Sequence, residues 1–330
     1  MMINVAINGF GRIGRIVFRI GFKEKSLNFV AINDLTDSKT LAHLLKYDTV
    51  HGRFDADIES GSGYIKVNGK KIPILSEKDP AKLPWKKLKV DIVVESTGRF
   101  TKEKDLKHHL ECGAKKVLLS APGKGGDVKT IVMGANEKQV KNLNICSNAS
   151  CTTNSLIPVV RVLDEEFGIE KGFMSTIHAY TNDQRLLDLP HKDLRRSRSA
   201  AANIIPTTTG AAKSVGEVFP HLNGKMDGLA FRVPIPCGSI TDLTCLLKKE
   251  TSVEAVNKAM KKASKTYLKG ILEYSEEPLV SSDIIGNRHS SIFDSQLTKV
   301  NGKLVKVCSW YDNEWGFSVR MVDMLKLMGK

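Results

Sequence analysis

The chain has 330 residues, of which 41% are hydrophobic and 26% are charged. These shares are those of an ordinary globular protein, and the length exceeds what one hydrophobic core usually supports, so two domains are expected. No apolar run approaches the roughly 18 residues of a membrane span, and the first residues lack the layout of a signal peptide. The expected location is therefore the cytoplasm, with no membrane partner.

The charge balance is basic, with 50 Lys and Arg residues against 36 Asp and Glu and a formal net charge of +14. Such a balance raises the question of nucleic acid. The basic residues are scattered and accompany no nucleic-acid-binding signature, so nucleic acid is not expected as the main partner. An anionic small substrate would be attracted by the same field. The six cysteines show neither the density of a disulfide scaffold nor paired zinc-type spacing, which predicts reduced thiols and no metal site.

The first half of the chain alternates short apolar runs with helical periodicity. Strands are expected at 3–8, 28–34, 90–97 and 115–122, and helices at 12–24 and 38–48. This alternation implies right-handed crossovers and a parallel sheet. The fold class is therefore α/β, with a Rossmann-type doubly wound parallel sheet over residues 1–150.

Beyond residue 150 the pattern changes to the two-residue period of half-exposed strands. Such strands are expected at 172–180, 228–236, 239–249 and 303–312, with amphipathic helices at 252–267 and 315–328. The second domain, residues 151–314, is thus expected to be α+β on a mostly antiparallel sheet, with the helix within 315–330 packing back on the first domain. The stretch 181–210 has little periodicity, and loops of that length are usually functional or bridge subunits.

Three glycines follow the first strand in the spacing G-x-G-x-x-G: Gly9, Gly11 and Gly14. Glycines here let the turn close and let a pyrophosphate approach the start of the helix, where free N–H groups and the helix dipole stabilise its charge. Asp34, at the end of the next strand, suits the ribose diol of the adenosine. A phosphate on that ribose would meet a carboxylate, so the pattern predicts NAD over NADP.

The stretch SNASCTTNS, residues 147–155, places Cys151 in the first turn of a predicted helix. A free thiol has a pKa of about 8.5, so a thiolate at neutral pH needs a shift of about two units, or about 2.7 kcal/mol. A helix terminus supplies about 0.3 to 2 kcal/mol, so a nearby cation is also needed. Among the histidines, His178 ends a predicted strand and precedes the polar cluster AYTND. A pairing of Cys151 with His178 would supply both a nucleophile and a general acid/base.

Six motifs in this order resemble the phosphorylating glyceraldehyde-3-phosphate dehydrogenase family: NGFGRIGR, ASCTTN, IHAYTNDQ, IPTTTGAAKSVG, FRVPIP and WYDNEWGFS. The resemblance implies a glycolytic enzyme that oxidises and phosphorylates D-glyceraldehyde 3-phosphate with NAD and inorganic phosphate. In this scheme Cys151 attacks the aldehyde and becomes a thiohemiacetal and then a thioester. His178 takes the hydroxyl proton, and its cationic form activates the thiol.

The resemblance also assigns the binding residues. Thr181 and Arg232 would hold the phosphate of the substrate. The residues implied for the attacking phosphate are Ser150, Thr152, Thr209, Gly210 and Arg198. Besides the three glycines and Asp34, those implied for NAD are Arg12, Ile13, Lys78, Ser120 and Asn313. Leu189 and Pro190 resemble the NAD-type loop that reaches a neighbouring subunit, which implies a homotetramer.

Two other interpretations stay open at the level of the sequence. Erythrose-4-phosphate dehydrogenase shares the fold and nucleophile but need not use phosphate as acceptor, and the intact phosphate-binding threonines favour the first interpretation. A basic binding protein with secondary enzyme machinery is the alternative from another class, and weak retention on nucleic acid at physiological salt would count against it.

Overall fold

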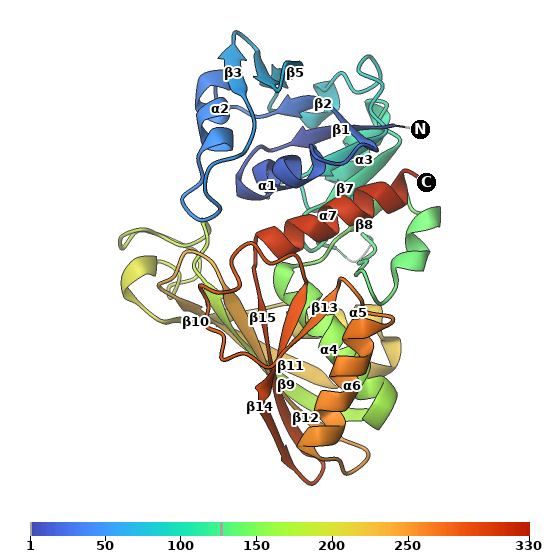
Figure 1. The fold of residues 1–330 in the computed structure, drawn as a ribbon. Coiled ribbons are helices and arrows are strands. Elements are labelled where there is room, and N and C mark those ends of the chain that lie inside the picture. Colours follow the sequence, from blue (N-terminus) through green and yellow to red (C-terminus); the bar gives the residue numbers. More distant parts are fainter. Residues whose placement is uncertain (1, 126–127) are drawn as a thin grey trace. The chain divides into compact units, whose positions relative to one another are not determined.

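The computed structural model describes residues 2–125 and 128–330, which group into two units (Figure 1). By its internal contacts the first unit comprises 1–131, 137–149 and 318–330, and the second comprises 132–136 and 150–317. The predicted first domain, 1–150, also spans residues 1, 126 and 127, which lie outside the described residues. Lys116 Nζ donates to the carbonyl of Met328 at 2.7 Å, so the end of the last helix packs within the first unit.

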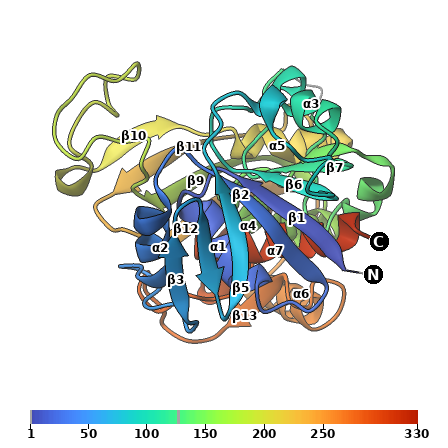
Figure 2. The same ribbon diagram turned by 90° about the horizontal axis from the view of Figure 1, so that it is seen from above.

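An eight-stranded sheet forms the first unit, in the order β3-β4-β5-β2-β1-β6-β7-β8 (Figure 2). All pairings from β5 to β8 are parallel, which confirms the predicted Rossmann-type sheet. The antiparallel strands β3 to β5 were not predicted, because their runs are short and partly exposed. The strands are β1 (Ile3–Asn8), β2 (Leu27–Asn33), β3 (Ile58–Gly61), β4 (Tyr64–Val67), β5 (Lys70–Leu75), β6 (Ile92–Glu95), β7 (Lys116–Leu119) and β8 (Ile145–Ser147).

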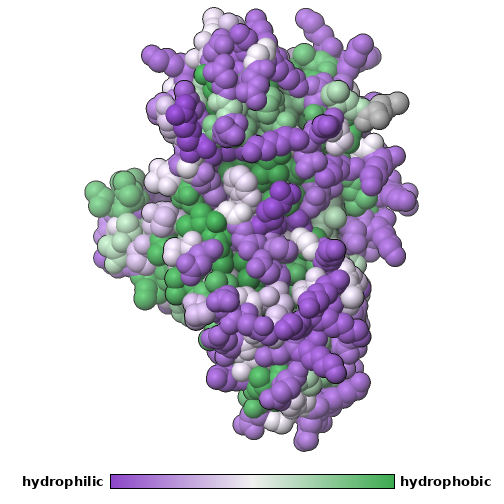
Figure 3. Space-filling view, viewed as in Figure 1, coloured by the Kyte–Doolittle hydropathy of each residue, from purple (hydrophilic) through white to green (hydrophobic). Residues whose placement is uncertain are grey.

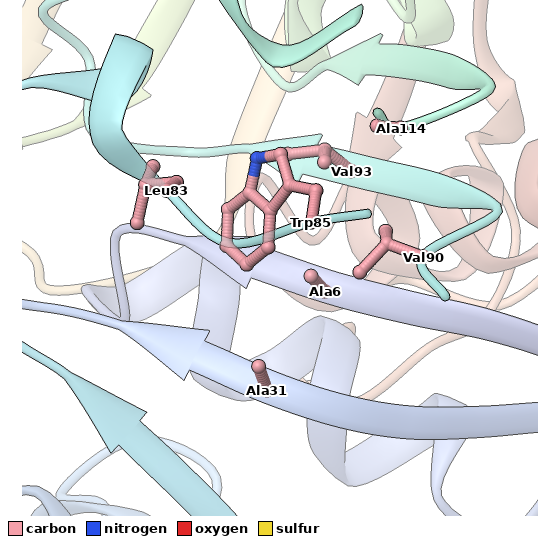
Figure 4. Packing of buried hydrophobic residues seen from close by; sticks show 7 residues of the cluster. All are labelled: Ala6, Ala31, Leu83, Trp85, Val90, Val93 and Ala114. Carbon is pink, nitrogen blue, oxygen red and sulfur yellow. The ribbon is translucent and has the colours of Figure 1, made fainter. Parts of the chain in front are cut away.

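Both faces of the parallel sheet are covered, as a doubly wound fold requires. Helix α1 (Arg12–Gly21) lies on one face, close enough that an added Cβ at Gly14 would come 3.2 Å from the Ile7 side chain. Ala6 and Val93 point to the other face, where they pack against Trp85 (Figure 4). Leu106 of α3 (Glu103–Glu111) packs on β7. Helix α2 (Ser38–Lys46) lies beside β3 and β4.

A seven-stranded sheet forms the second unit, in the order β10-β11-β9-β12-β15-β14-β13. Four neighbouring pairs are antiparallel, and two, β9 with β11 and β13 with β14, are parallel. The predicted α+β unit on a mostly antiparallel sheet is therefore confirmed. The strands are β9 (Ile169–Ala179), β10 (Ile205–Thr208), β11 (Met226–Val233), β12 (Ser239–Leu247), β13 (Leu272–Ser275), β14 (Ser291–Asn301) and β15 (Leu304–Tyr311).

Helix α4 (Cys151–Phe167) packs on β9, β12, β14 and β15 and is flanked by α5 (Ala211–Val218) and α6 (Val253–Lys265). Helix α7 (Trp315–Met328) ends the chain. Among the described residues, every helix is too short or too polar to cross a bilayer.

The segment 180–204, between β9 and β10, is a long loop with a single 3-10 turn. Four of its leucines, at 186, 187, 189 and 194, are between 59% and 82% exposed. Figure 3 shows hydrophobic surface on the left side, where Figure 1 draws the segment next to β10. An apolar loop of this size on the surface is typical of a segment that another chain covers.

Candidate active site

The glycine turn after β1 meets two steric demands that only glycine satisfies. Gly9 has φ +90°, and an added Cβ there would lie 2.6 Å from the backbone nitrogen of Thr97. A Cβ on Gly14 would lie 2.3 Å from the carbonyl oxygen of Gly9, so the helix starts directly against the turn. Gly11 differs, because a Cβ there would meet no atom within 4 Å. It faces open space, where a ligand could approach.

The N-terminus of α1 is open as well. Gly11 is its N-cap and supplies no side-chain oxygen to cap the first turn. The Arg12 guanidinium pairs with Asp48, with Nη1 lying 3.1 Å from Asp48 Oδ2. A helix N-terminus without a side-chain cap fits pyrophosphate binding.

A pocket of about 320 Å³ lies in the first unit at the carboxyl ends of the parallel strands. Asp34 lies in its wall, and its two oxygens accept N–H bonds from Phe10 at 2.8 Å and Thr36 at 3.0 Å. Each oxygen keeps a lone pair for further donors, such as ribose hydroxyls. The lining residues are Asn8, Gly9, Gly11, Asn33, Asp34, Leu35, Glu77, Lys78, Ser96, Thr97, Arg99 and Phe100. The pocket and the open helix terminus together fit a dinucleotide.

Two further residues assigned to NAD lie outside this lining. Ser120 directly follows β7, at the same carboxyl edge of the sheet, and its N–H donates to the carbonyl of Glu95. Asn313 belongs to the second unit, where its Oδ1 accepts from the Gly238 N–H at 3.1 Å and from Ser239 Oγ at 3.0 Å. These bonds fix the orientation of the amide and leave its NH₂ group to donate.

In the second unit, Cys151 is the first residue of α4, with Ser150 as N-cap. The Ser150 Oγ accepts from the Thr153 N–H at 3.0 Å, so the cap is closed by a side chain and the thiol lies in the first turn. Cys151 Sγ lies 3.3 Å from Nε2 of His178, which is 4% exposed. The two residues are 27 positions apart in the chain. They meet because His178 lies near the end of β9, next to the first residue of α4.

The strand register brings a cation to the same place. Arg232 on β11 pairs with His178 on β9 in the parallel ladder, and its Nη1 lies 2.7 Å from Nδ1 of the imidazole. The Ala179 carbonyl lies 2.6 Å from the same Nδ1 and also accepts from Arg232 at 3.0 Å. At Nδ1 the Ala179 carbonyl can only accept and the Arg232 guanidinium can only donate. The tautomer whose Nδ1–H donates to Ala179 is the one that keeps the Nε2 lone pair directed at the thiol.

Burial dominates the electrostatics of the pair. It raises the pKa of the Cys151 thiol, and the positive charge of Arg232 opposes part of that rise. Burial together with the charge of Arg232 lowers the pKa of His178 to about 3. Both shifts favour the uncharged thiol and imidazole, and the Arg232 cation lies next to the imidazole.

Three of the residues assigned to phosphate adjoin this pair: Ser150 and Thr152 flank Cys151 in the chain, and Arg232 contacts His178. Thr181 follows β9 two residues after the His178–Ala179 end, and its N–H donates to Gln184 at 3.3 Å. Arg232 Nε is buried and has no hydrogen-bond partner among the described residues, which suits an incoming anion. Thr152 is buried next to Cys151, and its Oγ1 lies 3.0 Å from the Tyr311 hydroxyl.

Helix α5 supplies a second open terminus. Gly210 is its N-cap and offers no side-chain cap, and a Cβ there would meet no atom within 4 Å. Thr209 Oγ1 accepts from the Ala211 N–H at 3.2 Å, so the threonine hydroxyl lies at the start of the helix. Helices α4 and α5 pack together, so both termini belong to one unit.

Arg198 is placed differently from the other assigned residues. Its Nε donates to Asp188 at 2.9 Å, and both side chains of this ion pair are more than half exposed. Arg196 lies nearer to Thr209, because its Nε donates at 2.8 Å to Thr207 Oγ1 two residues earlier. Its Nη1 pairs with Asp183. Arg196 also lies close enough to Arg232 to lower its pKa. The sequence offered no signal to choose between these arginines, because both belong to the aperiodic stretch RRSRSA.

A pocket on a Rossmann-type sheet that fits a dinucleotide, and a thiol–imidazole pair on a second α+β unit, are typical of a nucleotide-dependent oxidoreductase with a candidate cysteine nucleophile. Comparison with known proteins gives the family. Residues 3–103 match the model of the glyceraldehyde 3-phosphate dehydrogenase NAD binding domain, and residues 150–313 match that of the C-terminal domain.

Relatives named glyceraldehyde-3-phosphate dehydrogenase match over the whole chain. The one from Thermotoga maritima is 60% identical, with 100% of each chain covered. The one from Geobacillus stearothermophilus is 58% identical, over 98% of this chain and 97% of the relative. Glyceraldehyde-3-phosphate dehydrogenase 2 of Bacillus subtilis is 55% identical, over 99% and 96%. The chain belongs to the glyceraldehyde-3-phosphate dehydrogenase family, and its cofactor is NAD.

Proposed function

We propose that this protein oxidises D-glyceraldehyde 3-phosphate with NAD and inorganic phosphate to 1,3-bisphosphoglycerate, with residues 1–150 as the NAD-binding domain and 151–314 as the catalytic domain. The observation that carries the proposal is the 3.3 Å approach of Cys151 Sγ to His178 Nε2, with the Arg232 guanidinium on the other side of the imidazole. A nucleophile, a base and an anion-binding cation then meet within one unit.

The chemistry begins at the sulfur. Cys151 Sγ bonds to the aldehyde carbon, and the thiol proton passes to the resulting oxygen by way of His178 Nε2. His178 then takes the proton of that hydroxyl, and the hydrogen bond from Nδ1–H to the Ala179 carbonyl stabilises the imidazolium that forms. NAD, when bound, supplies the hydride acceptor. Asn313 would orient it through the carboxamide of the nicotinamide.

The thioester on Cys151 is then cleaved by inorganic phosphate, whose oxygen bonds to the acyl carbon as the sulfur leaves. Thr181 and Arg232 hold the phosphate of the substrate. The attacking phosphate is held by Ser150, Thr152, Thr209 and Gly210, and we add Arg196 to this set because it bonds to Thr207 on the strand that leads to Thr209. A planar guanidinium suits this task because it can bind two phosphate oxygens at once.

The same proposal covers the surroundings of the enzyme. The exposed leucines of segment 180–204 support burial of this loop against other copies, as in a homotetramer. Cytoplasmic location agrees with six cysteines that are all free thiols.

An absorbance assay for NADH tests the proposal, with aldehyde and phosphate varied separately. Turnover of glyceraldehyde 3-phosphate that rises with phosphate and saturates is the expected result. Efficient turnover of erythrose 4-phosphate that is indifferent to phosphate would favour the alternative, erythrose-4-phosphate dehydrogenase, and would overturn the proposal.

A further inference from the structure

A buried carboxylate, Glu95, ends strand β6 and is completely inaccessible to solvent. Its Oε2 accepts from Asn8 Nδ2 at 2.6 Å and lies 3.1 Å from Nε2 of His109. Its Oε1 accepts from the Thr97 N–H at 2.9 Å and from the Thr97 hydroxyl. Burial of a carboxylate is costly unless several donors satisfy it, so this arrangement calls for a reason.

The donor role of His109 is fixed from its other side. Trp85, whose indole is shown in Figure 4, donates from Nε1 to His109 Nδ1 at 3.0 Å. Nδ1 must therefore accept, and in the neutral ring Nε2 must carry the proton. His109 consequently donates to Glu95. Each group in contact with the carboxylate is a donor, and an ionised carboxylate, which only accepts, is the matching partner.

The same carboxylate controls a chain of amides that leads to the NAD pocket. Asn8 donates to Glu95 and, through Oδ1, accepts from Asn33 Nδ2 at 2.7 Å. Asn33 in turn holds the peptide of Glu77, donating to its carbonyl at 2.9 Å and accepting from its N–H at 2.9 Å. Asn8, Asn33, Glu77 and Thr97 all line the pocket, and Lys78 follows directly.

The direction of the hydrogen bonds along Asn8 and Asn33 is set at both ends of this row of amides. The N–H and C=O of Glu77 allow only one orientation of the Asn33 amide, and that orientation requires an acceptor from Asn8. Asn8 must then present its NH₂ group to residue 95. Turning either amide would place donor against donor or acceptor against acceptor, in a buried site where an unmade bond costs about 1 to 3 kcal/mol.

We propose that Glu95 is a positioning residue for the adenosine half of NAD: through Asn8 and Asn33 it holds the 77–78 segment, and it also holds Thr97, another residue of the pocket lining. The inference rests on the proposed use of this pocket for NAD. It concerns a residue that does not line the pocket and so acts only through its neighbours.

The test is Glu95→Gln in the full chain, with AMP and NAD titrated by calorimetry. A glutamine has the same shape, but in either orientation its NH₂ group faces a donor: the Thr97 N–H, or both Asn8 and His109. We expect the Kd of AMP and that of NAD to rise by the same factor, about tenfold or 1.4 kcal/mol. At saturating NAD, kcat should change by less than about twofold.

Asp294→Asn is the matched control. Asp294 in the second unit is also a buried carboxylate, and it accepts from the indole of Trp310 at 3.1 Å. Both variants should have a lower melting temperature than the unaltered protein, and only Glu95→Gln should bind AMP more weakly. Equal loss of stability with an unchanged AMP Kd would leave Glu95 as a packing residue and overturn the inference. Absence of AMP and NAD binding in the unaltered protein would instead overturn the assignment of the pocket.

Substitutions at His109, which also lies outside the pocket lining, keep the inference testable if Glu95→Gln does not fold. Glutamine at this position can still donate to Glu95, whereas leucine cannot. The expected result is an AMP Kd within about twofold of the unaltered protein for His109→Gln and about fivefold weaker for His109→Leu. The same AMP affinity in both variants would overturn the inference.

Discussion

The two units build their sites by different means. In the first unit the binding surface is largely backbone: a turn closed by Gly9 and the uncapped start of α1, with Asp34 as the main charged side chain. In the second unit the reactive groups are side chains, Cys151, His178 and Arg232, which the fold gathers from a helix and two strands. A backbone site depends on local spacing, whereas a side-chain site depends on strand register.

This difference predicts how each site fails. A substitution in the second unit removes a reacting group and should lower turnover sharply, while cofactor binding survives. A substitution in the first unit leaves the chemistry intact and should change only the affinity or selectivity for NAD.

The largest effect is expected for Cys151→Ser. A serine hydroxyl is a far weaker nucleophile next to a neutral imidazole, so kcat should fall by at least about 10⁴-fold, while the NAD Kd stays within about twofold. Single-turnover NADH formation and NAD titration measure the two quantities. Retained turnover would place the nucleophile elsewhere in the chain.

Arg232→Gln should produce the next largest loss, about a hundredfold in kcat/KM for the aldehyde, because it removes a charged donor to phosphate. It also removes the charge that opposes the raised pKa of Cys151 and that helps to lower the pKa of His178. Both pKa values should therefore move upward.

The rate of alkylation by iodoacetamide measures how much of Cys151 is ionised, because only the thiolate reacts. In Arg232→Gln the rate at neutral pH should fall, and the pH profile should shift to higher pH, by one unit for each tenfold loss of thiolate. An unshifted profile would mean that Arg232 does not influence the sulfur.

Arg196→Gln and Arg198→Gln form a matched pair within one loop. Arg196 bonds to Thr207 and pairs with Asp183 while its side chain is 20% exposed, whereas Arg198 pairs with Asp188 and is 62% exposed. The first substitution should lower kcat/KM for inorganic phosphate by about ten- to thirtyfold, and the second by less than about twofold, because exposed ion pairs contribute little. The reverse order would restore Arg198 to the site that the family resemblance gave it.

The same difference between the two units explains how much of the fold and of the sites the sequence predicts. The spacing of Gly9, Gly11 and Gly14 and the position of Asp34 define a pocket, because they are fixed by one strand, one turn and one helix. The strands β3 to β5 escaped prediction because their alternation is brief and their side chains are partly exposed.

Side chains that meet through the sheet are harder to predict. Arg232 lies 54 residues from His178, and only the parallel register of β9 and β11 makes them neighbours. The choice between Arg196 and Arg198 depends on the path of an irregular loop, which has no periodicity to read. Glu95 could not be predicted for another reason. It lies at the end of an apolar run in VDIVVEST, and its partners come from β1, from α3 and from Thr97 just after β6.

The smallest effect is expected in the first unit, for Asp34→Ala. Each Asp34 oxygen accepts one backbone N–H and keeps a lone pair for the ribose diol, and the same charge repels a phosphate at that position. Loss of this carboxylate should weaken the binding of NAD and remove the repulsion of NADP. The ratio of kcat/KM for NAD to that for NADP should therefore fall by about tenfold. The alkylation rate of Cys151 should not change, because that sulfur belongs to the other unit. An unchanged ratio would contradict the role of Asp34, and a changed alkylation rate would show that the two sites do not fail independently.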